Sequence, residues 1–265
     1  MTDDERQRHA RSFRGDMAAY ARARPGYPRA ALDWVLPIGA VDVVDLGAGT
    51  GQLTRSLLAG RSRGLRVTAV DPSPGMRAAL TASLPGMTVL DGSGEDLPVP
   101  DASQDAVLCA QAWHWVDPVR AGAEVARVLR PRGLLGLIWN ARDETGRWAA
   151  EFGELLRGSG QDAATGRSPT GSVEGDGDPD AGPDAGPLFS LERGPDVPWT
   201  QHLEPDGLVD LAASRSHLLV QEEVDRVPVL VAVADLARRW AGSTASGLVE
   251  LDYVTRSWRG PRTDR

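Results

Sequence analysis

Short apolar, β-branched runs alternate with stretches of helical periodicity over the first part of the chain. The runs predict strands over residues 41–45, 65–71, 87–90, 105–112 and 133–139. The stretches between them place apolar residues at helical spacing and predict helices over 53–59, 74–84 and 118–130. Continuous apolar strands that alternate with helices are typical of a parallel sheet with helices on both faces.

The pattern changes after a further predicted helix over 146–157. From Gly158 to Pro187 the chain holds eight glycines and four prolines with few bulky apolar residues, too few to offset the entropy cost of ordering. We therefore expect a disordered insertion there. Beyond it, the pattern predicts strands near 196–203 and 248–258 and helices over 205–214 and 221–240, with a frayed tail from Arg259.

Composition is compatible with one large α/β domain. The 265 residues are 41% hydrophobic, which is enough to form a full core. Net charge is −8, but six acids against Arg167 in residues 158–187 account for −5 of it. The remainder is near neutral and shows no basic field, so we expect no nucleic-acid partner. Every basic residue is arginine, which excludes chemistry that needs a catalytic or phosphate-binding lysine.

Other features narrow the class of protein further. The single cysteine, Cys109, lies in an apolar run and cannot form an internal disulfide. The N-terminal residues 1–6 are charged and unlike a signal peptide, and no stretch approaches the ~20 apolar residues of a membrane span. We expect a cytoplasmic protein with no membrane contact.

The most informative segment is the turn after the first predicted strand, Val43-Val-Asp-Leu-Gly-Ala-Gly-Thr-Gly-Gln52. Gly47, Gly49 and Gly51 permit positive φ angles and let a ligand approach the backbone closely. In open α/β sheets this turn lies at the carboxyl ends of the strands, where ligands bind. Gln52 stands where a dinucleotide-binding fingerprint has its third glycine, which argues against that class of site.

With its neighbouring motifs, this turn resembles the class I S-adenosylmethionine-dependent methyltransferases, particularly the small-molecule branch related to quinone-biosynthesis and trans-aconitate methyltransferases. The resemblance covers most of the chain. Its further motifs are Phe13…Tyr20-Ala-Arg-Ala-Arg-Pro-Gly-Tyr-Pro28, Ala69-Val-Asp-Pro72, Gly94-Glu-Asp-Leu-Pro98, Ala110-Gln-Ala-Trp-His-Trp115, Leu129-Arg-Pro-Arg-Gly133, Trp199-Thr-Gln201 and Ser214-Arg-Ser216.

The resemblance implies a doubly wound, mostly parallel seven-stranded sheet of Rossmann-like type with helices on both faces. It also implies S-adenosylmethionine as cofactor and a small-molecule acceptor. The expected divisions are an N-terminal helical cap (1–40), a cofactor-binding α/β core (41–157), the disordered insertion (158–187), and a C-terminal part (188–265) that completes the sheet and adds substrate-side helices. The sequence makes no prediction of oligomeric state.

The resemblance assigns the cofactor site to residues at the strand ends and in the N-terminal segment. These are Asp45, Gly47, Ala48, Gly49, Gly51, Asp71, Pro72, Ser93, Gly94, Glu95, Gln111, Tyr20 and Arg24. Asp71 ends the second strand, where its carboxylate can accept both ribose hydroxyls; it can equally serve as a turn or helix-capping residue. Asp45 is expected to hold amides of the glycine turn or the cofactor's ammonium group, or to have only a capping role.

The remaining assignments each have a structural alternative. Ser93 and Gly94 stand where the family often has Asp and Ala around the adenine, and Glu95 can be a ligand or a solvated loop residue. Tyr20 and Arg24 share a helix face. Arg24 can therefore meet the methionyl carboxylate or remain a surface arginine.

Candidate catalytic chemistry centres on His114, just after the fourth strand. An imidazole there can act as general base on a substrate hydroxyl, or it can only shape the pocket with its Trp neighbours. No His, Cys and acid cluster has metal-ligand spacing, so we predict no metal. Two other functions stay open: a non-catalytic adenosyl-ligand-binding protein and a nucleotide-dependent oxidoreductase.

Overall fold

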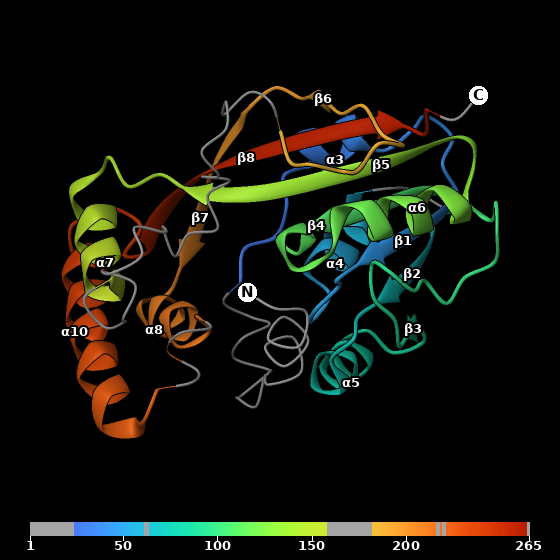
Figure 1. Cartoon of the computed structure of the whole chain (residues 1–265). Helices are drawn as coiled ribbons and strands as arrows, with labels where there is room; N and C mark the ends of the chain where they lie inside the picture. Colours follow the sequence, from blue (N-terminus) through green and yellow to red (C-terminus); the bar gives the residue numbers. More distant parts are fainter. Residues whose placement is uncertain (1–23, 61–63, 158–181, 216–217, 219–220, 264–265) are drawn as a thin grey trace.

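The computed structural model describes residues 24–60, 64–157, 182–215, 218 and 221–263 (Figure 1). The strands are β1 (Asp42–Leu46), β2 (Arg66–Val70), β3 (Thr88–Leu90), β4 (Gln104–Ala110), β5 (Leu129–Arg142), β6 (Glu192–Arg193), β7 (Val197–Leu203) and β8 (Val249–Pro261). The helices are α3 (Arg29–Val35), α4 (Gln52–Gly60), α5 (Pro74–Ser83), α6 (Pro118–Val128), α7 (Arg147–Arg157), α8 (Pro205–Ala213) and α10 (Glu223–Ala241), with a short 3-10 helix, η1 (Trp113–Trp115).

One sheet contains all of these strands, and its order is β3-β2-β1-β4-β5-β8-β6. The first five strands in this order are parallel, whereas β8 runs antiparallel to β5. Both β7 and β6 pair antiparallel with β8, β7 along 249–255 and β6 at 258–259. The eight strands of the described chain therefore fill seven positions. The doubly wound, mostly parallel fold expected from the sequence is confirmed.

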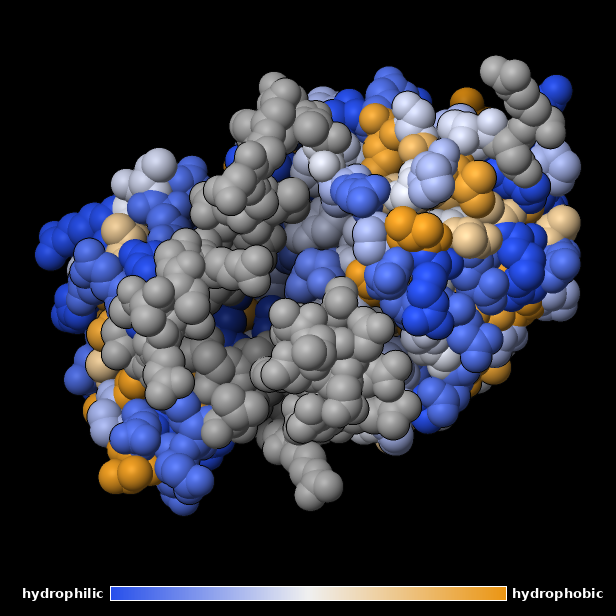
Figure 2. Space-filling model, in the orientation of Figure 1, coloured by the Kyte–Doolittle hydropathy of each residue, from blue (hydrophilic) through white to orange (hydrophobic). Residues whose placement is uncertain are grey.

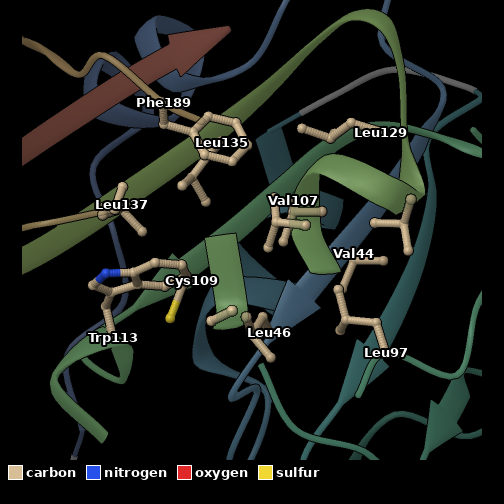
Figure 3. Packing of buried hydrophobic residues seen from close by; sticks show 14 of the residues in the cluster. Val44, Leu46, Leu97, Val107, Cys109, Trp113, Leu129, Leu135, Leu137 and Phe189 are labelled. Carbon is tan, nitrogen blue, oxygen red and sulfur yellow. The ribbon is translucent and has the colours of Figure 1, made fainter. Parts of the chain in front are cut away.

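Alternating residues of the parallel strands supply two cores, one on each face of the sheet, because side chains of a strand alternate in direction. Val44, Val107 and Leu135 pack with Val125 of α6 on one face (Figure 3). The opposite face has a core formed with α3 and α4; its members include Leu32, Val35, Val43, Leu53, Leu57, Val67, Ala106 and Leu108. Burial on both faces explains why these strands read as continuous apolar runs.

A further core lies beyond the end of β5, where α7, α8 and α10 pack against β7 and the start of β8 (Figure 1). Phe152, Leu208 and Leu236 are fully buried within it. Hydrophilic side chains predominate over α7 and α10 on the face in Figure 2, and hydrophobic ones form small separate patches. These helices stand beside the carboxyl ends of the parallel strands.

The prediction of a frayed tail from Arg259 is wrong. Strand β8 continues to Pro261, and Arg259 Nη1 donates to the carbonyl oxygen of Trp34 at 2.7 Å. The guanidinium also lies 4.5 Å from the centroid of the Trp34 ring. The apolar pattern missed this extension because the stabilising partners come from α3, far away in the sequence.

The predicted end of the insertion at Pro187 is also wrong. The indole Nε1 of Trp113 donates to the carbonyl oxygen of Asp184 at 2.7 Å, and Ala185 is buried in the core. A Cβ on Gly122 would lie only 2.4 Å from the Ala185 carbonyl oxygen, so this segment packs closely on α6. The rest of the predicted insertion, 158–181, lies outside the described residues.

The boundary between the third predicted helix and the fifth strand also shifts. Helix α6 ends at Val128, and β5 begins at once with Leu129, which pairs with Gln104. Pro131 therefore lies inside the strand, whereas the sequence placed a helix up to residue 130.

Candidate active site at the carboxyl ends of the parallel strands

A cavity of about 740 Å³ lies at the carboxyl ends of the parallel strands. Its lining comes from the turns after β1, β2, β3 and β4, together with the segment before α3 and the start of the loop to α6. Most of the predicted site residues line it: Arg24, Asp45, Gly47, Ala48, Gly49, Asp71, Pro72, Ser93, Gly94, Glu95 and Gln111. Parallel strands bring these turns to one edge of the sheet, as expected.

The three glycines of the first turn have different roles. All have positive φ, at +68° for Gly47, +55° for Gly49 and +90° for Gly51. A Cβ on Gly47 would lie 2.5 Å from the Ala112 Cβ, and one on Gly51 would lie 3.0 Å from Leu80. A Cβ on Gly49 would meet nothing within 4 Å, so this glycine opens onto the cavity.

Gly51, which the sequence assigned to the cofactor site, therefore has a packing role instead. It does not line the cavity. Its role is to bring the start of α4 close to α5.

Asp45 has one partnered and one unpartnered carboxylate oxygen. Oδ2 accepts a hydrogen bond from Thr54 Oγ1 at 2.6 Å, while Oδ1 is buried with no partner among the described residues. Burial raises the pKa of Asp45 to about 7, against the hydrogen bonds from Thr54 that lower it. Asp45 thus does not hold the turn amides. Thr50 Oγ1, which lines the same cavity, is also buried without a partner.

Asp71 both lines the cavity and organises its wall. Oδ2 accepts from the Gly49 N–H and Oδ1 from the Ser73 N–H, both at 2.8 Å. Ser73 in turn caps α5 by accepting from the Met76 N–H. Burial raises the pKa of Asp71, although the two backbone hydrogen bonds lower it. The structural role and a ligand-facing position therefore coexist in one residue.

The loop after β3 closes another side of the cavity. Ser93 and Asp96 exchange backbone hydrogen bonds, and Ser93 Oγ accepts from the Glu95 N–H at 3.3 Å. Glu95 Oε1 accepts from the Asp117 N–H at 2.7 Å, so its carboxylate ties this loop to the start of α6. Asp91, which sequence reasoning missed, also lines the cavity and pairs with Arg77.

Gln111 and Asn140 form the wall after β4 and β5. Gln111 has a φ of +58°, uncommon outside glycine, and its Nε2 donates to the Asn140 carbonyl oxygen at 3.0 Å. The Asn140 amide donates to the Gly26 carbonyl and accepts from Thr255 Oγ1. Sequence reasoning missed Asn140, although a buried amide at the end of an apolar strand was a possible signal.

The segment before α3 lines another side of the cavity. Arg24 lines the cavity, and its Nη2 donates to the Ser214 carbonyl oxygen at 2.8 Å, which links this segment to the end of α8. Gln52 Nε2 donates to the Arg24 carbonyl oxygen at 2.9 Å. Contact of Arg24 with a methionyl carboxylate stays a prediction. Tyr20, its predicted partner on a helix face, lies outside the described residues.

His114 does not line the cavity. It sits exposed in η1, with its ring 4.6 Å from the Trp115 ring, while Trp115 itself lines the cavity and Trp113 is buried in the core. Desolvation lowers the pKa of His114 even though the residue keeps contact with solvent. The geometry favours a role in supporting Trp115 over that of a base at the reacting atoms.

The described residues also bear on other kinds of site. No group of three or more His, Cys, Asp or Glu side chains there is arranged to hold a metal ion. Within the same residues, no helix has the length and apolar character needed to cross a membrane.

Comparison with known proteins decides the family. A family model described as a methyltransferase domain matches residues 44–137. An uncharacterized methyltransferase of Mycobacterium tuberculosis is 45% identical over 245 residues, which cover 92% of this chain and 93% of the relative. The chain belongs to the class I S-adenosylmethionine-dependent methyltransferases. This confirms the predicted methyltransferase family and enzyme class and argues against the oxidoreductase alternative, while the small-molecule branch stays a prediction.

Other relatives of this methyltransferase are more distant. A methyltransferase-like protein of Schizosaccharomyces pombe is 38% identical over 150 residues, covering 55% of this chain and 58% of its own. The malonyl-[acyl-carrier protein] O-methyltransferase of Hahella chejuensis is 41% identical over 97 residues, which cover 36% of this chain and 34% of that relative.

Two solved structures share the fold. One, described as a type II methyltransferase from Anaeromyxobacter dehalogenans, has a TM-score of 0.64 at 23% identity and covers 90% of this chain and 97% of its own. The other is described as a methyltransferase from an antibiotic biosynthesis pathway of Anabaena variabilis. Its TM-score is 0.54 at 21% identity, and the match covers 88% of this chain and 95% of that structure.

Proposed function

We propose that this enzyme transfers a methyl group from S-adenosylmethionine, bound in the cavity, to a small-molecule acceptor. The observation that carries the proposal is Asp45 Oδ1, a buried carboxylate oxygen without a partner in the cavity wall. Such an atom carries a desolvation cost that a ligand donor can remove. The ammonium group of a methionyl moiety is a donor of that kind, and it carries the opposite charge.

The rest of the lining fits the same ligand. Gly49 leaves open space where any side chain would intrude on a ligand. The Asp71 carboxylate keeps lone pairs for ribose hydroxyls beyond the two backbone bonds that it accepts. Ser93 and Gly94 line the cavity and would border the adenine ring, and the buried Thr50 hydroxyl would bind the methionyl carboxylate together with Arg24.

When bound, S-adenosylmethionine supplies an electrophilic methyl group. The protein's own contribution is alignment and exclusion of water. Trp115 and Val116 provide an apolar wall, and burial raises the pKa of the Cys109 thiol so that it remains protonated. With His114 outside the lining, we infer that the acceptor brings its own nucleophilicity. The near-neutral body of the chain favours a small molecule over nucleic acid.

A mass-shift screen tests this proposal. The protein is incubated with a metabolite extract and either S-adenosylmethionine or its trideuteromethyl form, and products are compared by mass spectrometry. We expect a product whose mass differs by the isotopic label between the two reactions. Asp45→Asn should reduce its yield. The matched control Asp235→Asn, on an exposed ion pair of α10, should not. Label transfer that is equal in wild type and Asp45→Asn would contradict the assigned site.

A further inference from the structure

Arg142, at the end of β5, is a buried cation with unused donors. Its side chain is 2% exposed and lies 4.8 Å from the centroid of the Phe152 ring. Nη2 donates to Glu144, whose carboxylate also pairs with Arg157. The Nε and Nη1 groups are buried and have no hydrogen-bond partner in the described part of the chain. Leaving charged donors unsatisfied in the interior is costly, so this arrangement calls for a ligand.

Tyr253 is the neighbour of Arg142 on the adjacent strand. It stands directly opposite Arg142 in the β5–β8 pairing, which puts both side chains on one face of the sheet. Its hydroxyl is buried and has no hydrogen-bond partner among residues that the structure describes, and its ring stacks on Trp199 with 5.2 Å between centroids. The phenol is therefore held rigidly with one hydrogen-bonding group unused.

This face continues into the cavity. Asn140 lies two residues before Arg142 and lines the cavity, and Thr255, which bonds to Asn140, lies two residues beyond Tyr253. Two strand residues span about 7 Å, so the unused donors stand one step beyond the cavity wall on the same surface. The positive charges of Arg215, Arg142 and Arg24 also reach Tyr253, where they oppose the burial that raises its pKa.

We propose that Arg142 and Tyr253 bind a carboxylate of the methyl acceptor, so that the substrates of this enzyme are small carboxylic acids. Two guanidinium N–H groups and one hydroxyl match the acceptor lone pairs of one carboxylate. The positive charges of Arg215, Arg142 and Arg24 that reach Tyr253 favour a negatively charged ligand beside it. This assignment rests on the proposed function, since it places the acid beside the cofactor cavity.

Binding to the full-length protein, with and without saturating S-adenosylhomocysteine, tests the assignment. The probes are benzoate, malonate, succinate and citrate, and the methyl ester of benzoate and inorganic phosphate serve as comparisons. Calorimetry measures the affinity of each probe. Arg142→Gln removes the cation. Tyr253→Phe removes one buried, unpartnered hydroxyl and should leave folding stability intact or slightly raised. Arg238→Gln removes the same charge from an exposed ion pair of α10 and serves as control.

We expect at least one carboxylate to bind the S-adenosylhomocysteine complex, the ester and phosphate to bind at least about tenfold more weakly, and both site variants to lose about tenfold or more in carboxylate affinity. Affinity for S-adenosylhomocysteine should stay within about twofold in every variant. No carboxylate binding, binding unchanged in Tyr253→Phe and Arg142→Gln, or a preference for phosphate would overturn the proposal. A variant that instead loses S-adenosylhomocysteine would assign these donors to the cofactor. Failure of wild type to bind S-adenosylhomocysteine would count against the proposed function, while carboxylate binding without it would still decide the anion site.

Discussion

Asp45 shows most clearly how a single residue carries function at the expense of stability. Its pKa is raised to about 7 by burial, whereas an unfolded aspartate titrates near 3.8. Between these values the folded protein retains a proton that the unfolded chain has lost. Asp45 therefore contributes its full stability only below about pH 4, and that contribution falls as pH rises towards 7, by up to about 4 kcal/mol.

A ligand ammonium beside Asp45 should reverse this preference. Because the positive charge favours the carboxylate, binding of S-adenosylhomocysteine at pH 6 should release about one proton, and affinity should rise with pH up to about 7. Calorimetry in two buffers of different ionisation enthalpy measures the proton count. Release should be near zero at pH 8 and absent in Asp45→Asn. Equal proton release in Asp45→Asn and wild type would show that another group titrates.

His114 allows a sharp test of catalytic role. Because it lies outside the cavity lining, His114→Gln should keep S-adenosylhomocysteine affinity and lower kcat by less than about tenfold. His202→Gln, a similar change at an exposed position of β7, gives the background. Steady-state kinetics with an identified acceptor decides between the roles. A loss of about 10²-fold or more, together with disappearance of an ionisation between pH 5.5 and 8, would restore His114 as the base.

At the level of elements, the glycine turn divides into a position that faces the ligand and one that packs. Gly49→Ala should weaken S-adenosylhomocysteine binding by about tenfold or more, because its Cβ enters the cavity. Gly51→Ala should mainly lower the free energy of unfolding, since its Cβ would meet Leu80 at 3.0 Å.

Gly39→Ala is the matched control for backbone strain. Gly39 has a φ of +81° and open space around it, but it does not line the cavity. The Gly39→Ala substitution should lower the free energy of unfolding by about 1–2 kcal/mol and leave the affinity for S-adenosylhomocysteine unchanged. Chemical denaturation and calorimetry on the three variants separate the effects. Equal loss of affinity in Gly49→Ala and Gly39→Ala would mean that Gly49 does not face the ligand.

Elements defined by local pattern were predictable from the sequence, whereas elements defined by distant partners were not. Strands β1 and β4 are buried on both faces, so each reads as an apolar run, and the turn at Gly49 carries its own spacing signal. The extension of β8 depends on Arg259 meeting Trp34 of α3. Tyr253 became visible as a site residue only once β5 paired with β8, which no local pattern encodes.

At the level of the whole molecule, the cavity is lined by residues between Arg24 and Asn140, and hydrogen bonds tie this lining to the C-terminal elements. Arg24 links the segment before α3 to the end of α8, and Asn140 links β5 to that same segment. The C-terminal elements therefore support the cavity lining from outside, whereas the glycine turn forms part of the lining itself.

The chain between α7 and β6 should separate into dispensable and structural parts. Replacing 158–181 with a short Gly-Ser linker should leave Tm within about 2 °C and preserve the shift caused by S-adenosylhomocysteine, because closure entropy depends weakly on loop length. Extending the replacement to Pro187 should lower Tm by several degrees, since it removes the acceptor for Trp113 and the buried Ala185. Thermal unfolding measures both. A lost ligand shift in the shorter replacement would place 158–181 in the site.

Calorimetric titration of S-adenosylmethionine into wild type and Asp71→Ala, with NADH as a parallel ligand, tests the central claim most directly. The cavity should bind S-adenosylmethionine at one site per chain and should not bind NADH. Asp71→Ala should weaken binding by about 1–3 kcal/mol, because the ribose hydroxyls and the Gly49 N–H lose their acceptor. No binding of S-adenosylmethionine to the folded wild type, or equal affinity in Asp71→Ala, would contradict the assignment of this cavity.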